Sequence, residues 1–311
     1  MPSRIRLLPS LLAVLLTLAI PRPAPAIDDP PCEIGLALGS GGAAGLAHIA
    51  MLEVFDDLET APSMIAGTSI GAVIGALYAA GLDAARIRAL FEEFGGSGLD
   101  ALSELAGGDN GLDLRDVMNL DLEHGGLVDP AGFIEFLAAQ TDVQRFEDLR
   151  IPLEVVATDY WTGRTVILDD GDLFEAVQAS MAVPGLFSPV RNGERLLIDG
   201  GTTNPLPVDR LRARCRTVIA VDVSGARPQP GDEAGENVSD LLFGSFELMQ
   251  QALIRQARLT DPPDLYLRPE IRGVRLLHFN RIDRVLAQAA PGAERLRAFL
   301  LRHPRTDGAS P

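Results

Sequence analysis

Apolar residues follow two alternating patterns along the chain, and together they predict a layered fold. Short, almost unbroken apolar runs of about four to eight residues are typical of strands buried on both faces of a sheet. Longer stretches with apolar residues every three to four positions are typical of helices that cover such a sheet. The expected strands are 33–39, 63–67, 153–159, 164–171, 195–201, 216–224 and 264–269, and the expected helices are 43–58, 70–80, 83–94, 172–183, 241–259 and 281–301. Because strands and helices alternate, we expect an α/β fold with a mainly parallel central sheet flanked by helices on both faces.

Two stretches carry neither pattern. Residues 95–130 are rich in glycine and aspartate, and we expect irregular loops with short helices there, which makes this stretch a hypothetical lid. Residues 226–239 are polar with proline and glycine, so a loop is expected.

The first 26 residues differ from the rest of the chain. Arg4 and Arg6 precede an apolar run from Leu7 to Ile20, and the small-residue segment 24–26 follows it. The run is shorter than the roughly 20 apolar residues that span a bilayer. We therefore predict a signal peptide, residues 1–26, and an exported protein, periplasmic or secreted. A short membrane anchor that is retained is the alternative.

The charge balance limits the possible partners. Removing residues 1–26 removes three arginines and no acidic residue, which takes the net charge from −16 to −19. Such a surface repels phosphate backbones, so no nucleic-acid partner is expected. It also argues against docking on anionic lipid through a basic patch, so any transient membrane contact should be apolar and local.

Cysteine and histidine provide no metal site in the sequence. The chain has only Cys32 and Cys215, and two free, partly buried thiols are slightly favoured over a disulfide. Its four histidines show no metal-ligand spacing, and no acidic calcium loop is present, so we expect no metal.

A glycine-rich loop, "LALGSGGAAGLAHIAML", connects an expected strand to an expected helix. It lacks the Gly-Lys-Ser/Thr of a phosphate-binding P-loop. It also fits a dinucleotide fingerprint poorly, because the third glycine, Gly45, comes one place late. The third interpretation is an oxyanion hole, in which backbone N–H groups stabilise charge that develops during acyl transfer.

Ser69 is the candidate nucleophile. It lies in Gly67-Thr68-Ser69-Ile70-Gly71, a G-x-S-x-G sequence between a strand and a helix, although a serine can also simply begin a helix. A serine nucleophile needs a base. One option is a downstream histidine, as in α/β-hydrolases. The other is Asp199, which ends an apolar strand but could equally belong to an ordinary Asp-Gly turn.

The ordered motifs resemble those of the patatin-like phospholipases, which are lipid acyl hydrolases with a Ser–Asp dyad. The matching segments are "LALGSGGAAGLAHIAML", "GTSIGA", "ATDYWTG", "AVQASMAVPGLFSPV" and "LLIDGGTTNPLPVD", and "HFNRIDRVLAQ" is similar to the C-terminal part of bacterial members. The resemblance covers about residues 34–224.

This resemblance implies a patatin-like fold and a role for each matched residue. Ser69 would be the nucleophile, Asp199 the general base, and Gly41, Gly42, Ala43 and Ala44 the oxyanion loop. It further implies a lipid or acyl-ester substrate, no histidine and no cofactor. The expected domains are a catalytic domain, 34–225, and a C-terminal helical extension, 226–311, packed on it. The remaining motif glycines are Gly45, Gly67, Gly71, Gly200 and Gly201.

Two positions depart from the family pattern. Ala44 stands where the family usually has a basic residue, and Ser40 replaces a glycine. Backbone donors survive both changes, but a nearby positive charge is lost. The rival hypothesis is therefore a patatin-fold module that binds lipid or protein with little catalysis.

Overall fold

The computed structural model describes residues 32–97, 131–225 and 238–303. Residues 31–311 form one compact unit, distinct from residues 1–30, and this unit is described here. Its strands are β1 (Cys32–Leu38), β2 (Met64–Thr68), β3 (Leu153–Asp159), β4 (Arg164–Leu168), β5 (Val190–Asn192), β6 (Arg195–Asp199), β7 (Cys215–Val221) and β8 (Leu265–Leu267). Its helices are α1 (Ala47–Asp57), α2 (Ile70–Ala79), α3 (Ala84–Ser97), α6 (Ala131–Ala138), α7 (Leu173–Ser180), α8 (Val208–Arg212), α9 (Val238–Thr260) and α10 (Ile282–Arg302). Short 3-10 helices are η1 (Gly42–Leu46), η3 (Phe146–Asp148), η4 (Gly200–Thr202) and η5 (Phe279–Arg281).

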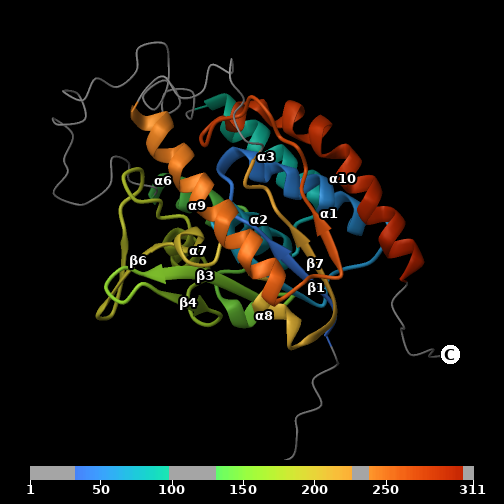
Figure 1. Cartoon of the computed structure of the whole chain (residues 1–311), viewed down its shortest axis with the longest axis horizontal. Coiled ribbons are helices and arrows are strands. Elements are labelled where there is room, and N and C mark those ends of the chain that lie inside the picture. The colour runs from blue at the N-terminus through green and yellow to red at the C-terminus, as the bar shows by residue number, and fades with distance from the viewer. Residues whose placement is uncertain (1–31, 98–130, 226–237, 304–311) are drawn as a thin grey trace, which may run out of the picture. The chain divides into compact units, whose positions relative to one another are not determined.

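The strands form a single sheet in the order β5-β6-β3-β2-β1-β7-β8, with β4 paired to β3. Strands β3, β2, β1, β7 and β8 run parallel to their neighbours in that order. Beyond β3 the pairing is antiparallel: β4 and β6 each pair with β3, and β5 pairs with β6. Figure 1 shows the central strands side by side between helices. The α/β fold with a mainly parallel sheet is therefore confirmed.

Helices cover both faces of the sheet. Since successive strand residues point to opposite sides, each face has its own set of buried side chains. On one face, Leu36 and Ile219 belong to the large core that includes residues of α1, α2, α3, α7 and α10. On the other face, Ala37 and Ala220 pack with Leu211 of α8 and Ile254 of α9. Several strand residues on this second face are alanines, among them Ala37, Ala66 and Ala220.

The end of the chain contributes to the same unit. The region expected as a helical extension, 226–311, supplies β8, which pairs with β7, and α10, which packs along α1. The region therefore contains a strand as well as helices. The expected boundary between residues 225 and 226 stays a prediction. Of the expected loop 95–130, residues 95–97 instead continue α3, and of the expected loop 226–239, residues 238 and 239 begin α9. The rest of both loops, with the hypothetical lid, and the signal peptide lie outside the described residues.

Cys32 and Cys215 form a disulfide, so the preference for free thiols was wrong. The two residues lie opposite each other in the register of the parallel pair β1 and β7. Sequence spacing could not show this, because the residues are 183 positions apart. The bond adds a covalent link between the neighbouring strands β1 and β7.

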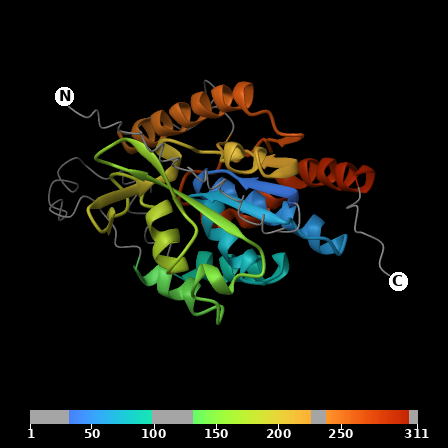
Figure 2. The same ribbon diagram turned by 90° about the horizontal axis from the view of Figure 1, so that it is seen from below.

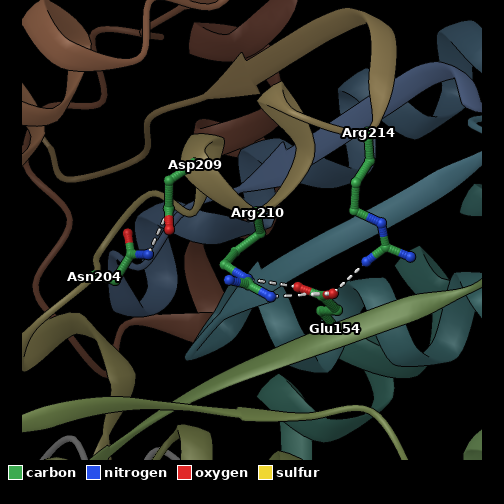
Figure 3. Close-up of polar contacts among 5 residues, drawn as sticks. All are labelled: Glu154, Asn204, Asp209, Arg210 and Arg214. Carbon is green, nitrogen blue, oxygen red and sulfur yellow. Dashed lines mark hydrogen bonds and ion pairs between the residues drawn. The ribbon is translucent and has the colours of Figure 1, made fainter. Parts of the chain in front are cut away.

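Two ion pairs to one buried carboxylate, Glu154, fix α8 on the sheet (Figure 3). Glu154 of β3 is buried and binds Arg210 and Arg214, with N–O distances of 2.8 and 2.5 Å. Next to it, the Asn204 amide donates to Asp209 at 2.7 Å. The contacts hold the chain that follows β6, which matters for the site because Asn204 also accepts a hydrogen bond from the Thr68 hydroxyl at 2.9 Å.

Candidate active site

Ser69 lies at a sharp turn between β2 and α2, and its backbone is strained. Its φ is +55°, in the left-handed region that side chains other than glycine rarely adopt. A Cβ at Gly67 would lie 2.6 Å from the Gly71 carbonyl oxygen, and one at Gly71 would lie 2.2 Å from the Leu38 oxygen. Only glycine at both positions lets α2 start this close to the strands. The turn therefore holds the serine at the head of a helix.

Ser180, at the end of α7, holds the strained turn in place. Its hydroxyl accepts the Ser69 N–H at 2.8 Å and donates to the Val156 carbonyl at 2.6 Å. All three residues are buried, so these hydrogen bonds are shielded from water. Sequence reasoning missed Ser180, although it lies inside the matched segment "AVQASMAVPGLFSPV".

The sheet register brings Asp199 to Ser69. Strand β2 ends with Thr68 opposite Val156 of β3, and β6 ends with Asp199 opposite Ala157, the next residue of β3. Because β4 occupies one edge of β3, strands β2 and β6 share the other edge and run toward each other. Their ends meet there. This junction brings together the two predicted catalytic residues, Ser69 directly after β2 and Asp199 at the end of β6.

The Asp199 carboxylate is buried and incompletely hydrogen-bonded. Its Oδ1 accepts the Gly201 N–H at 2.6 Å, while Oδ2 accepts no hydrogen bond of good geometry from any described residue. The backbone is fixed by Asp199 N–H donating to the Ala182 oxygen at 2.9 Å. The acid is therefore rigidly placed, with one oxygen left open.

Burial raises the pKa of Asp199 to about 6, although the Ser69 hydroxyl and the Gly201 N–H both act in the opposite direction. The Ser69 hydroxyl is thus close enough to stabilise the charged carboxylate, but the pair is not locked in a well-aligned hydrogen bond. Such loose contacts are common in resting active sites and tighten when substrate binds. A carboxylate with this pKa is largely ionised at neutral pH and is a better proton acceptor than an ordinary aspartate.

The glycine loop packs against the start of α2. A Cβ at Gly45 would lie 2.2 Å from the Ile70 side chain, so the loop can approach only because that residue is glycine. Gly42 has φ +53° and begins η1, whose first N–H groups have no partner inside the helix. Of the predicted donors, the Ala43 N–H is already bound to the Leu276 oxygen at 2.8 Å. Gly41 and Gly42 therefore fit an oxyanion hole better than Ala43 does, and Ala44 is a buried apolar residue of η1.

A buried polar link connects the two loops of the site to α9. The Ser40 hydroxyl donates to Gln250 Oε1 at 2.8 Å, and a Cβ at Gly201 would lie 2.2 Å from Gln250 Nε2. Gly200 is equally close to its surroundings, since a Cβ there would lie 2.1 Å from the Val156 oxygen. Gln250 thus contacts Ser40 of the glycine loop and Gly201, two places after Asp199. Nothing in the sequence motifs indicated it.

Three of the four histidines, His48, His278 and His303, lie in the described part of the chain, and each has a hydrogen-bond partner there. His48 is buried and binds the Gly39 oxygen through Nε2 at 2.8 Å, so Nε2 carries the proton and Nδ1 is an unpartnered acceptor. Burial lowers the pKa of His48 to about 4, which keeps it neutral below the loop. His278 accepts the Arg275 N–H, and His303 binds the Phe299 oxygen. The Ser69 hydroxyl acts instead on the pKa of Asp199.

A second buried aspartate, Asp222, follows β7 and is well partnered. It accepts the Ser224 N–H at 2.9 Å and the Tyr266 hydroxyl, and Arg268 lies 3.7 Å away. In the ranges that the structure describes, no group of three or more His, Cys, Asp or Glu side chains could hold a metal ion.

Comparison with known proteins places the chain in a family. The family model for patatin-like phospholipases matches residues 36–212. An uncharacterized NTE family protein of Mycobacterium tuberculosis is 31% identical over 211 residues, covering 67% of this chain and 53% of the relative. Human patatin-like phospholipase domain-containing protein 6 is 27% identical over 276 residues, covering 81% of this chain and 19% of that protein. The chain therefore spans about half, or much less, of the length of these relatives.

Among solved structures, VipD from Legionella pneumophila is similar, with a TM-score of 0.48 and 15% identity, covering 86% of this chain and 67% of VipD. The family model includes both the glycine loop and the segments that carry Ser69 and Asp199. It matches more than half of the sequence, and the chain belongs to the patatin-like phospholipase family.

Proposed function

We propose that the protein is a serine acyl hydrolase that cleaves fatty-acyl ester bonds of phospholipids or related lipids. The observation that carries the proposal is the junction of β2 and β6, where strained Ser69 meets a buried aspartate with an open oxygen. Membership of the patatin-like phospholipase family supports the lipid class of substrate. No cofactor takes part in the proposed reaction.

In the first half of the reaction, Ser69 Oγ attacks the ester carbonyl carbon while its proton passes to Asp199. The carbonyl oxygen gains the negative charge, which the Gly41 and Gly42 N–H groups stabilise. The tetrahedral intermediate then breaks its bond to the alcohol, and Asp199 returns the proton to that leaving oxygen. The product at this stage is an acyl ester on Ser69.

The second half repeats these steps with water. Asp199 takes a proton from a water molecule, whose oxygen attacks the acyl carbon. The intermediate collapses, the proton returns to Ser69 Oγ, and the fatty acid leaves. The raised pKa of Asp199 suits both halves, because a base that titrates near the working pH can accept and return a proton.

Hydrolysis assays with matched variants test this mechanism. The chain from Ile27 onward would be incubated with phospholipids, lysophospholipids and short-chain acyl esters, beside Ser69→Ala and Asp199→Asn. Ser63→Ala is the matched control, because Ser63 precedes β2 and its hydroxyl accepts the Ile34 N–H at 3.3 Å, outside the proposed site. We expect activity in the wild type and Ser63→Ala only. Activity that survives Ser69→Ala would refute the mechanism.

The rival function is a lipid- or protein-binding module with little catalysis. It is favoured by Ala44, a buried apolar residue at the position where the resemblance leads one to expect a basic side chain. A fluorophosphonate probe separates the two functions, since only an activated serine reacts with it. Labelling that Ser69→Ala removes supports the hydrolase, and an unlabelled wild type supports the module.

We also propose that the protein is exported, as the N-terminal sequence predicts. The Cys32–Cys215 disulfide supports this, because such bonds persist in oxidising compartments. N-terminal sequencing of protein recovered from cell fractions tests it. A mature form that starts at Ile27 outside the cytoplasm is the expected result, and an uncleaved cytoplasmic form would contradict it.

A further inference from the structure

Helix α9 presents its apolar residues to solvent. Nine large hydrophobic side chains are exposed in the described part of the chain, and six of them belong to α9. Their exposed fractions lie between 38% and 80%. The six residues, here called the outer face of α9, are Leu241, Leu242, Leu248, Met249, Leu253 and Leu259. Figures 1 and 2 show α9 as the outermost element on its side of the sheet in two perpendicular views.

The opposite side of α9 meets the protein through apolar residues, among them Phe243 and Phe246, and through two buried glutamines. Gln250 binds Ser40, and Gln251 donates to the Ser224 oxygen at 3.0 Å. Both glutamines are buried, and Ile254, one turn later, packs against the sheet. These contacts fix the rotation of the helix, so the outward orientation of its apolar residues is a built feature of the fold.

The charges on α9 differ from those of the chain as a whole. The protein is strongly acidic, with a net charge of −16. Helix α9, however, carries two acids, Asp240 and Glu247, and two arginines, Arg255 and Arg258, so it has no net excess of acid. From residue 241 onward its exposed charged side chains are the two arginines, and Glu247 is partly buried with its pKa raised to about 7 by burial. Arg258 stacks on the Tyr266 ring, 3.5 Å from its centre. Apolar side chains flanked by arginines complement an anionic lipid surface.

We propose that α9 docks flat on a phospholipid surface that contains anionic lipids, with its outer face in the boundary between headgroups and acyl chains. This inference rests on the proposed function, because a lipid hydrolase must reach substrate that lies in such a surface. The docking helix would also lie next to the proposed active site, since Gln250 of α9 binds Ser40 and contacts Gly201. Within the described ranges no helix is long and apolar enough to cross a bilayer, and surface docking needs none.

A second copy of the chain is a poorer occupant of this face. A helix of 23 residues is roughly 35 Å long, and its exposed side covers roughly 350 Å². A stable protein interface buries about 800 Å² on each partner. The outer face of α9 alone is therefore too small to hold a dimer together, whereas a lipid surface accepts a single amphipathic helix.

Vesicle sedimentation tests the proposal. The chain from Ile27 onward keeps the compact unit of residues 31–311 and omits the apolar N-terminal run, which would bind lipid by itself. Leu242→Gln would be compared with Leu301→Gln on α10, because the two leucines are 65% and 64% exposed. The triple variant Leu242→Gln/Leu248→Gln/Met249→Gln enlarges the effect, and thermal unfolding shows that each variant is folded.

With phosphatidylcholine vesicles that contain phosphatidylglycerol, we expect wild type and Leu301→Gln to sediment. The triple variant should bind about tenfold more weakly or worse, because it replaces three apolar side chains at the interface. Equal binding of the triple variant and the control would overturn the proposal. So would a wild-type dimer that the triple variant dissociates in light-scattering measurements, since the face would then belong to a second copy.

A fluorescence measurement gives a second, independent readout. Trp161 is the single tryptophan, so Trp161→Phe gives a protein without tryptophan fluorescence. Leu248→Trp or Leu301→Trp can then be introduced into it. We expect brominated lipids to quench the tryptophan at residue 248 and not the one at residue 301. Equal quenching at both positions, or none at either, would refute docking through α9.

The docking proposal and the hydrolase proposal fail separately. The triple variant should hydrolyse a soluble short-chain ester as the wild type does, because none of its changes lies in the catalytic machinery. Ser69→Ala should still bind vesicles. If vesicle binding depends on α9 but no ester is hydrolysed, the docking proposal stands and the hydrolase proposal is refuted. If esters are hydrolysed but the triple variant binds vesicles as the wild type does, the hydrolase proposal stands and the docking proposal is refuted.

Discussion

Two buried aspartates of this protein lie in similar positions and have different surroundings. Asp199 ends β6 and Asp222 directly follows β7, and each side chain is 1% exposed. Both oxygens of Asp222 accept hydrogen bonds, from the Ser224 N–H and the Tyr266 hydroxyl, and Arg268 lies close by. Asp199 has one N–H donor on Oδ1 and no well-aligned partner on Oδ2.

The comparison shows how burial can serve stability in one place and chemistry in another. A buried carboxylate with all its partners contributes to the fold, and removing it leaves donors unsatisfied. A buried carboxylate that lacks partners is costly to the fold, but its open oxygen and raised pKa are what a proton acceptor needs.

Loss of the dyad should have the largest effect. Ser69→Ala and Asp199→Asn should each lower kcat/KM for ester hydrolysis by about a thousandfold or more, because each removes an essential part of one reaction. The double variant should be no worse than the more damaged single variant, since members of one catalytic unit are not additive. Steady-state kinetics on all three variants checks this, and additive losses would show that Asp199 acts independently of Ser69.

Replacing Asp222 should damage stability instead. Asp222→Ala leaves the Ser224 N–H and the Tyr266 hydroxyl without their acceptor and Arg268 without its nearby carboxylate, which should lower the free energy of unfolding by roughly 2 to 4 kcal/mol. Urea denaturation measures this loss. Turnover per folded molecule should stay close to wild type, and a thousandfold loss of turnover with normal stability would break the comparison.

Removing the Ser180 hydroxyl should give an intermediate effect. Ser180→Ala deletes the acceptor of the Ser69 N–H, so the strained turn loses its support and the nucleophile shifts. A small misplacement of a reacting group costs about tenfold to a hundredfold in rate. We expect a lower kcat with KM almost unchanged and with the shape of the pH profile preserved. Ser180→Thr, which keeps a hydroxyl, should recover part of the rate, and an equal loss in both variants would argue for a packing role.

The candidate site was predictable where one short segment carries its own physical signature. A strand, a small-residue turn and a helix around Ser69 are visible in the sequence, and so is an apolar strand that ends at Asp199. The segment 153–159 also matches β3 to the residue. In contrast, the expected helix 43–58 begins as the 3-10 turn η1, because Gly42 has a positive φ and the Ala43 N–H bonds outside the helix.

The remaining features depend on contacts between distant segments. Ser180 meets Ser69 from 111 positions away, and Gln250 meets Ser40 from 210 positions away. The disulfide depends on the pairing of β1 with β7, which no local pattern specifies. The exposed apolar face of α9 was also invisible, because periodicity shows that a helix has two faces but not which one turns outward. These features follow from the sheet order, and that order is set by the whole chain.

The smallest expected effect is the pH dependence, and it follows from the raised pKa of Asp199. The base must be ionised, so log kcat/KM should rise with a slope of about one below pH 6 and level off above it. Asp222→Asn should keep this profile, because Asp222 is not the base. A plateau that extends well below pH 6 would mean that another group accepts the proton.

The same shift should change stability in the opposite direction. The ordinary pKa of Asp199 is 3.8 and its folded value is about 6, so between these values the folded state binds more protons than the unfolded state. Wild-type stability should therefore contain a contribution that is full below about pH 4 and lost as the pH rises through about 6. Asp199→Asn lacks this titration, and it should gain stability over wild type as the pH rises. Urea denaturation of both proteins at several pH values measures the difference, and the pH dependence of His48 cancels because both proteins contain it. A difference that stayed flat from acid to neutral pH would mean that burial of Asp199 costs the fold nothing, and the contrast with Asp222 would then disappear.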